Sequence, residues 1–289
     1  MNRTEDGLER ILIVGSGFMG RGIAQICAQS GFSVTLLDRD ERALAEAQKE
    51  MQWSMEKLFS KGKVSHRPEK VLSMIHLSTD AMARFDVNFL FECVPEDLSV
   101  KTEVLRHYDR TCPGKTIFAS NTSAIPIGKL AVLTDRADRF IGTHFASPPV
   151  IQRLVELIPA LMTSAETVQS TRSLLEALDR EVVEVRADTA GFIMNRIYLI
   201  AAAEAIRLLE RGAGSAEDID RAMRVGYGWA KGPLEAADFA GLDVIHGAML
   251  SIWMDTGDPM FRPPERLCRL VEAGRLGRKT GEGLYDYKS

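Results

Sequence analysis

The feature that most restricts the possible folds of this chain is an apolar segment followed at once by a glycine-rich turn. Residues 11–14 read ILIV, a continuous apolar run typical of a buried strand, and residues 15–20 read GSGFMG. The next residues have the spacing of an amphipathic helix, and residues 33–38, SVTLLD, form a second predicted strand. Strand, glycine turn, helix and strand in this order predict the first unit of a Rossmann-type nucleotide-binding sheet.

The three glycines of the turn and the acid after the second strand indicate the ligand. Gly15 permits the tight turn, Gly17 lets the backbone approach a pyrophosphate, and Gly20 lets helix and strand pack closely. Asp38 follows Gly20 by eighteen residues, where a carboxylate can accept hydrogen bonds from the ribose hydroxyls of NAD. Arg39 weakens this preference because an arginine can accommodate the 2′-phosphate of NADP. NAD remains the expected cofactor.

The pattern along the chain predicts two domains of different class. A helical, amphipathic segment at about 40–75 is a long insertion for a nucleotide-binding sheet, and further strands follow it. The second part is almost wholly helical, and Gly212 and Gly226 are expected to end two of its helices. We therefore predict an α/β fold, with a Rossmann-type doubly wound sheet domain over residues 1–187 and an all-helical domain over residues 188–289.

Composition and charge exclude several classes of partner and site. The chain of 289 residues has a formal net charge of -4, so the basic face of a nucleic-acid-binding protein is not expected. Four cysteines and five histidines are scattered without the spacing of zinc ligands, and neither a metal site nor a disulfide framework is expected. No apolar run approaches the ~20 residues that span a bilayer, and the N-terminus lacks a secretory signal pattern. We expect a soluble cytoplasmic protein.

Polar side chains follow several of the predicted strands. Glu92 and Glu96 lie at the end of the apolar segment VNFLFE and in the loop after it, and residues 120–123, SNTS, follow another strand. The carboxyl ends of strands are where doubly wound sheets bind their ligands. The alternative is that Glu92 and Glu96 are exposed loop acids.

His144 ends an apolar run, and Glu156 follows it by twelve residues. The segments RFIGTHF and RLVELI, paired as a hairpin, would place the two side chains next to each other. Oxidation of a secondary alcohol requires removal of the hydroxyl proton, which a neutral imidazole can accept, while a carboxylate on the other ring nitrogen fixes the tautomer. The alternative for His144 is an imidazole packed in the core.

A series of longer motifs runs along nearly the whole chain. After GSGFMG come SNTS at 120, HF at 144, LVELI at 154, GFIMNR at 191, GPLEAADFAGLD at 232 and GRKTGEGLYDY at 277. This series resembles the L-3-hydroxyacyl-CoA dehydrogenase family, of the 3-hydroxybutyryl-CoA type. The resemblance implies an NAD-dependent oxidoreductase that interconverts L-3-hydroxyacyl-CoA and 3-ketoacyl-CoA in fatty acid metabolism by β-oxidation. It also implies that the helical domain binds substrate and forms a homodimer.

The resemblance assigns roles to the residues that match the family's motifs. It makes His144 the catalytic base and Glu156 its orienting carboxylate. Ser123 and Asn195 would contact the reacting oxygen of the substrate. The predicted cofactor contacts are Gly15, Gly17, Gly20, Asp38, Glu96, Lys101 and Lys279. The predicted contacts to the CoA substrate are Ser54, Lys61 and Ser123, and the alternative for Lys61 is a solvated helix end.

Two departures from the family pattern and three alternative functions accompany this interpretation. Ser147 stands where the family has asparagine, which bears on substrate fit or cofactor geometry. Ala190 stands where the family has proline, which makes the turn between the domains less rigid. A β-hydroxyacid dehydrogenase would use a lysine on the first helix of the second domain, but residues 130–230 contain none. A relative that acts on a free hydroxy acid or another small alcohol remains open because of Ser147. A non-catalytic structural protein would be expected to lack the residues assigned to catalysis.

Overall fold

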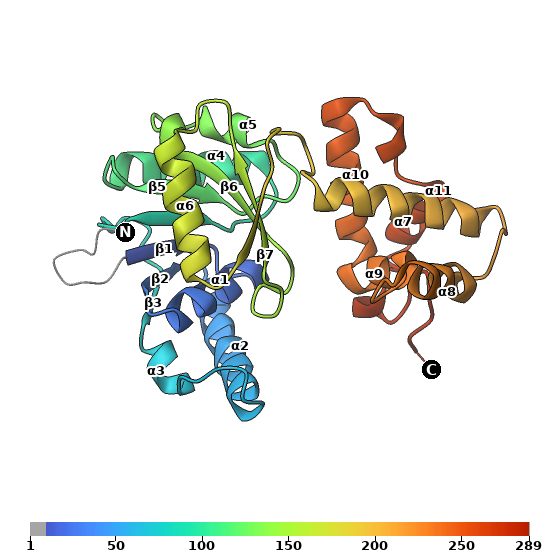
Figure 1. Cartoon of the computed structure of the whole chain (residues 1–289), viewed down its shortest axis with the longest axis horizontal. Helices are drawn as coiled ribbons and strands as arrows, with labels where there is room; N and C mark the ends of the chain where they lie inside the picture. The colour runs from blue at the N-terminus through green and yellow to red at the C-terminus, as the bar shows by residue number, and fades with distance from the viewer. Residues whose placement is uncertain (1–9, 289) are drawn as a thin grey trace. The chain divides into compact units, whose positions relative to one another are not determined.

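The computed structural model describes residues 10–288, and the chain divides into two compact units. The first unit runs to Asp188 and the second begins at Thr189, beside the boundary predicted at residue 187. Each unit has an apolar core of its own, one built around a sheet and the other among helices (Figure 1). The predicted combination of a Rossmann-type sheet domain with an all-helical domain is confirmed.

The first unit forms an eight-stranded sheet within the described residues, in the order β3-β2-β1-β4-β5-β6-β7-β8. The strands are β1 (Arg10–Val14), β2 (Ser33–Leu37), β3 (Ile75–Ser78), β4 (Phe89–Glu92), β5 (Ile117–Ser120), β6 (Phe140–Phe145), β7 (Leu154–Pro159) and β8 (Glu181–Glu184). Neighbouring strands of this sheet pair in parallel, except that β6 and β7 are antiparallel. The strand order changes direction at β1, where doubly wound sheets bind ligands.

Helices cover both faces of this sheet, which is why its central strands are apolar throughout. The helices of the first unit are α1 (Phe18–Gln29), α2 (Glu41–Ser60), α3 (Pro68–Leu72), α4 (Leu98–Thr111), α5 (Ile127–Ala131) and α6 (Ala165–Ala177). Ile11 and Ile13 of β1 lie on one face and share a core cluster with residues of α1, α2 and α6. On the other face α5 packs against β6, and α4 packs against α5 (Figure 1).

The predicted insertion at about 40–75 consists of α2 and α3, and it leads into a strand that the sequence did not predict. Asp40 begins α2 because its side chain accepts a hydrogen bond from the backbone N–H of Arg42. The unpredicted strand, β3, pairs with β2 at the edge of the sheet. Its four residues are half-buried or exposed, with His76 facing solvent, so it lacks the apolar run by which the other strands were found.

The second unit is built from five α-helices within the described residues. They are α7 (Met194–Glu210), α8 (Ala216–Tyr227), α9 (Pro233–Ala240), α10 (Leu242–Thr256) and α11 (Glu265–Glu272). Gly212 follows α7 with a φ of 67°, as expected for a residue that ends a helix. The prediction for Gly226 is wrong, because this residue lies inside α8 and Gly228 takes the left-handed conformation that ends the helix. None of the helices formed by residues 10–288 has the length and apolar character needed to cross a membrane.

Two fully buried carboxylates tie the C-terminal segment to the helices of the second unit. Asp220 accepts hydrogen bonds from backbone N–H groups at the start of α9 and from the hydroxyl of Tyr285. Asp238 accepts them from the backbone N–H groups of Leu284 and Tyr285 and from the hydroxyl of Tyr287. Burial raises the pKa of Asp238. The motif GRKTGEGLYDY thus has a structural basis in two buried acceptors on α8 and α9.

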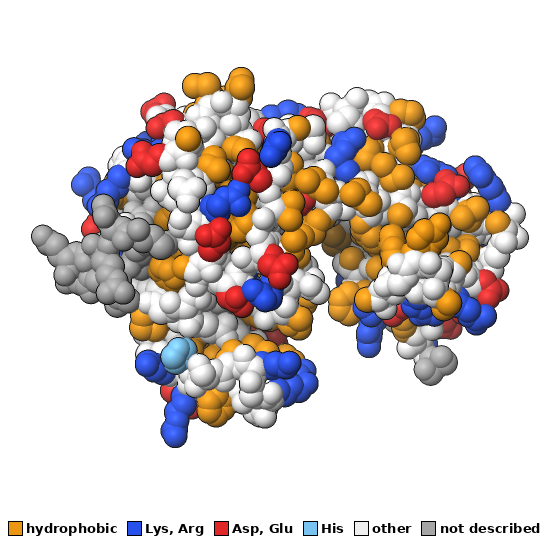
Figure 2. Space-filling view, viewed as in Figure 1, with side chains coloured by type: hydrophobic (Ala, Val, Ile, Leu, Met, Phe, Trp, Pro, Cys, Tyr) orange, Lys and Arg blue, Asp and Glu red, His pale blue; other side chains and the backbone are white. Residues whose placement is uncertain are grey.

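The surface of the second unit carries large apolar side chains. Ile197 is 65% exposed, Val225 82% and Met254 77%. Figure 2 shows that apolar side chains gather on the visible face of this unit, with basic and acidic side chains around them. Patches of this kind commonly mark a surface that another molecule covers.

Candidate functional site

The glycine turn between β1 and α1 is shaped partly by packing and partly by an open space. Gly15 has a φ of 101°, and a Cβ atom there would lie 2.6 Å from the carbonyl oxygen of Cys93. A Cβ atom at Gly20 would lie 1.8 Å from the carbonyl oxygen of Gly15. A Cβ atom at Gly17 would meet no atom within 4 Å. The turn therefore leaves room for a ligand beside Gly17, at the N-terminus of α1, where backbone N–H groups favour an anion.

Asp38 lies directly after β2 and touches this turn. Its Oδ2 accepts hydrogen bonds from the backbone N–H and the hydroxyl of Ser16, both at 2.8 Å. Its Oδ1 accepts one from the backbone N–H of Asp40 at 3.1 Å. The carboxylate is half-buried and keeps acceptor capacity for ribose hydroxyls. The open space at Gly17 and the acid at Asp38 fit NAD, and Ser16 is a further contributor that no sequence motif indicates.

His144 and Glu156 lie opposite each other in the antiparallel pair β6 and β7. Nδ1 of His144 is 2.7 Å from Oε2 of Glu156. Glu156 is fully buried, and 8% of His144 is exposed. A carboxylate on Nδ1 holds the ring proton on that atom, so Nε2 carries the lone pair that accepts a proton. This pair has the arrangement of a histidine base oriented by an acid.

The loop that carries Ser123 follows β5 and is held by one carboxylate. Oε1 of Glu96 accepts hydrogen bonds from the backbone N–H groups of Ser123 at 2.9 Å and Ala124 at 3.0 Å. The same oxygen accepts one from the hydroxyl of Thr122. Burial alone would raise the pKa of Glu96, but the Lys101 ammonium and these hydrogen bonds outweigh it, so the pKa is lowered. Glu96 is therefore a charged acceptor that sets the path of this loop.

Two further contacts fix the ends of the same loop. Oδ1 of Asn121 accepts a hydrogen bond from the backbone N–H of Phe145 at 3.1 Å, which joins the loop to the residue after His144. The carboxylate of Asp188 accepts hydrogen bonds from the first two backbone N–H groups of α5, at 2.7 and 2.6 Å. The loop and the His144 strand are thus one hydrogen-bonded assembly at the carboxyl edge of the sheet.

Lys101 lies inside this assembly rather than on its surface. The side chain of Asp97 caps the N-terminus of α4, and Lys101 lies in the first turn of this helix. Nζ of Lys101 is 2.8 and 3.0 Å from the two carboxylate oxygens of Glu92 and 3.2 Å from Oε2 of Glu96. Burial alone would lower the pKa of Lys101, but the two glutamates outweigh it and raise the pKa. The predicted contact of Lys101 with the cofactor stays a prediction, and Glu92 proves to be buried rather than a loop acid.

The remaining predicted residues belong to other elements of the fold. Ser54 is half-buried on α2 and lines a groove of about 190 Å³ whose walls include Phe18 and Trp53, and Lys61 is exposed directly after α2. Asn195 and Lys279 belong to the second unit, where Nζ of Lys279 is paired with the carboxylate of Asp243. Their proposed contacts with substrate and cofactor stay predictions. Residues 10–288 contain no cluster of three or more histidine, cysteine, aspartate or glutamate side chains arranged to hold a metal ion.

Comparison with known families accounts for both units. Residues 10–189 match the NAD binding domain of 3-hydroxyacyl-CoA dehydrogenase, and residues 191–287 match its C-terminal domain. The chain belongs to the 3-hydroxyacyl-CoA dehydrogenase family. The predicted family, enzyme class and NAD cofactor are thereby confirmed, and the β-hydroxyacid dehydrogenase alternative is excluded.

Individual relatives within the 3-hydroxyacyl-CoA dehydrogenase family are similar over at least 92% of their length. The chain is 40% identical to the human mitochondrial hydroxyacyl-coenzyme A dehydrogenase, with 97% of this chain and 92% of that protein covered. It is 37% identical to a probable 3-hydroxybutyryl-CoA dehydrogenase of Bacillus subtilis, with 97% and 98% covered. The crystal structure of (S)-3-hydroxybutyryl-CoA dehydrogenase from Ralstonia eutropha superposes with a TM-score of 0.92 at 36% identity, with 98% and 100% covered.

The position of Asp38 predicts the cofactor preference of this family member. NAD should bind more tightly than NADP by about 1 kcal/mol or more, because a 2′-phosphate would meet the Asp38 carboxylate. Asp38→Ala should narrow the difference and weaken both cofactors, since Ser16 loses its acceptor. Asp40→Asn is the matched control, because this side chain caps α2 through the backbone N–H of Arg42, whereas Ser16 of the turn bonds to Asp38. Calorimetric titration measures the affinity of each of the three proteins for both cofactors, and equal wild-type affinities for NAD and NADP would show that Arg39 outweighs Asp38.

Proposed function

We propose that the protein interconverts L-3-hydroxyacyl-CoA and 3-ketoacyl-CoA, with NAD as hydride carrier and His144 as the general base. The observation that carries this proposal is the contact of 2.7 Å between Nδ1 of His144 and Oε2 of Glu156, on two paired strands of a nucleotide-binding sheet. The names of the relatives from Bacillus subtilis and Ralstonia eutropha support a short-chain hydroxyacyl-CoA as the substrate.

The residues of the chain supply the proton transfer and the orientation of the substrate. In the direction of oxidation, Nε2 of His144 accepts the proton of the substrate hydroxyl, and Glu156 stabilises the imidazolium that forms. The hydroxyl of Ser123, on the loop held by Glu96, donates a hydrogen bond to the reacting oxygen. Bound NAD would supply the acceptor for the hydride. In the reverse direction His144 returns its proton to the ketone oxygen.

Replacement of the two paired residues tests the role of His144. His144→Gln should fold and bind NAD but lose roughly 100-fold or more in kcat, the scale of general-base catalysis. Glu156→Gln should lose a large part of the same rate, and the two losses should not add, because both residues serve one proton transfer.

His76→Gln is the matched control for these variants, because His76 is exposed on the edge strand β3, and its kinetics should match the wild type. A His144→Gln enzyme that folds, binds NAD and keeps near-normal turnover would make the imidazole a packed residue.

We also propose that Ser54 and Lys61 bind the CoA part of the substrate. The apolar walls of the groove beside Ser54 suit the flexible arm of a CoA thioester, and Lys61 offers an exposed cation near the end of α2 for a phosphate. Lys61→Ala should raise KM for hydroxybutyryl-CoA and leave kcat nearly unchanged, the pattern of lost uniform binding. Lys70→Ala, an exposed lysine of α3, is the control.

NADH formation with hydroxyacyl-CoAs of increasing chain length, beside the matching free acids, identifies the substrate class. Equal rates with the free hydroxy acids would favour the alternative left open by Ser147. An unaltered KM in Lys61→Ala would assign Lys61 to solvent.

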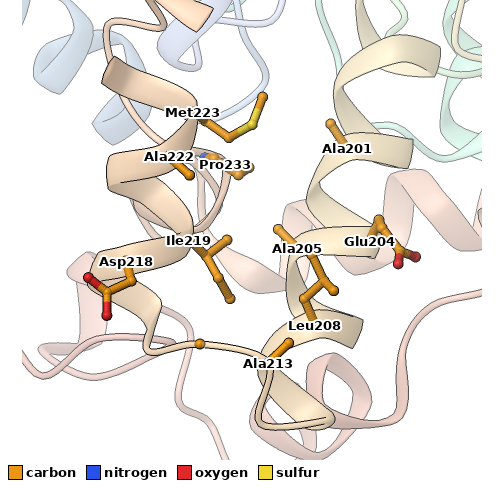
Figure 3. Close-up of a pocket in the computed structure, with 11 residues that line it drawn as sticks. Ala201, Glu204, Ala205, Leu208, Ala213, Asp218, Ile219, Ala222, Met223 and Pro233 are labelled. Carbon is orange, nitrogen blue, oxygen red and sulfur yellow. The ribbon is translucent and has the colours of Figure 1, made fainter. Parts of the chain in front are cut away.

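We further propose a homodimer formed through the second unit. A groove of about 460 Å³ runs between α7 and α8, with Ala201 and Ala205 on one side and Ile219 and Met223 on the other (Figure 3). Its apolar lining and the exposed side chain of Ile197 favour an apolar partner surface, which a second copy of this unit would offer. The cytoplasmic location and the part in β-oxidation expected from the sequence stay predictions.

A charge placed in this groove tests the dimer. The wild type should have the mass of a dimer in size-exclusion chromatography with light scattering. Ala201→Glu should shift it to monomer at the same concentration, because the dimer would bury an unpaired carboxylate. Ala165→Glu, at the exposed start of α6 in the first unit, should leave the dimer intact. An unchanged mass for Ala201→Glu would show that the groove is not part of the dimer interface. A monomeric wild type would contradict the proposed dimer.

A further inference from the structure

Glu92 is a fully buried carboxylate at the carboxyl end of β4, and nothing in the proposed reaction uses it directly. Besides the two contacts with Nζ of Lys101, its Oε1 accepts a hydrogen bond from the backbone N–H of Val94 at 2.9 Å. Its Oε2 accepts one from the hydroxyl of Ser120 at 2.6 Å. Glu92 thus holds the last residue of β5, directly before the loop that carries Ser123.

Lys101 links this buried acid to the acid that holds the loop. Its side chain is 1% exposed and lies between Glu92 and Oε2 of Glu96, whose side chain is 38% exposed. Oε1 of Glu96 is the atom that accepts the backbone N–H groups of Ser123 and Ala124. A continuous series of short contacts therefore runs from Glu92 through Lys101 and Glu96 to the backbone of Ser123.

A purely stabilising role does not account well for three charged groups here. Taking charges out of water costs free energy, and a buried ion pair often contributes no more to stability than well-packed apolar side chains of similar size. With two carboxylates and one ammonium, the cluster also keeps one excess negative charge. What the cluster does supply is a fixed position for Glu96, since each of its two oxygens is held by a separate set of donors.

We propose that Glu92 is a positioning residue for the dehydrogenase reaction, acting on Ser123 through Lys101 and Glu96. This inference rests on the proposed function, in which the Ser123 hydroxyl contacts the reacting oxygen. Without the carboxylate of Glu92, Lys101 moves toward Glu96 and changes the angle at which Glu96 holds the loop. A displacement of about 1 Å at a reacting group can cost on the order of 100-fold in rate.

The test is a double-mutant cycle between Glu92→Gln and Ser123→Ala. Gln keeps the size of the side chain and one acceptor, but it removes the charge that faces Lys101. Glu92→Gln alone should lower kcat for hydroxybutyryl-CoA by about 10-fold or more. In the Ser123→Ala background the same change should cost less than about 2-fold, because the group that it positions is already absent. Equal losses in both backgrounds would overturn the proposal.

Two further measurements separate positioning from general destabilisation. Glu103→Gln, an exposed acid on the same helix α4, should leave kcat unchanged in both backgrounds. Hydrogen exchange in Glu92→Gln should be faster at the amides of Ser123 and Ala124, whose acceptor is Glu96, and unchanged in β1. Unchanged exchange at those two amides would overturn the proposal.

The exchange measurement also keeps this inference distinct from the proposed function. Faster exchange at Ser123 together with a wild type that is inactive on hydroxyacyl-CoA would contradict the proposed substrate class. It would still support the positioning of the loop by Glu92. If Glu92→Gln alone fails to fold, Glu92→Gln with Lys101→Met removes both buried charges and keeps an acceptor for Ser120. The double variant should show the same loss and the same dependence on Ser123, and a wild-type kcat would contradict the proposal.

Discussion

The antiparallel pairing of β6 with β7, inside an otherwise parallel sheet, is the constraint on which the candidate active site depends. It places His144 directly opposite Glu156. Successive side chains of a strand point to opposite faces, so a register shift of one residue would separate the pair. Buried apolar neighbours on the same strands, such as Phe145 and Leu157, hold the register. Apolar packing on the two strands therefore contributes to the alignment of base and carboxylate.

The carboxyl edge of the sheet gathers buried polar groups that would be costly in isolation. Glu92, Lys101 and Glu156 are each almost wholly shielded from solvent, and each has a charged or hydrogen-bonding partner of opposite character. Such fully partnered networks are rigid, because any movement of one member leaves another without its partner. A rigid polar edge suits a reaction in which donors must be in place before charge develops on the substrate oxygen.

The sequence predicted the architecture and the pairing of His144 with Glu156 more completely than the contacts among Glu92, Lys101 and Glu96. Long apolar runs, the glycine turn and the spacing of His144 and Glu156 are local signals, and each corresponds to an observed element or contact. The strand β3 was not predicted, because an edge strand needs no apolar run. The contacts of Lys101 with Glu92 and Glu96 were not predicted, because a lysine in the first turn of a helix resembles a solvated residue until the position of Glu92 is known. The prediction for Gly226 was wrong because Gly228 lies two residues later, and the sequence pattern alone does not show which glycine ends the helix.

The glycine turn separates what the fold requires from what the ligand requires. Side chains at Gly15 and Gly20 would collide with the backbone of the protein itself, whereas a side chain at Gly17 would enter open space. Gly17 also has a φ of -58°, which any residue can adopt. A descendant that lost its dinucleotide could therefore accept other residues at Gly17 while Gly15 and Gly20 remained obligatory. In chains with this turn, the middle glycine indicates that a pyrophosphate binds there, and the outer two indicate only that strand and helix are in close contact.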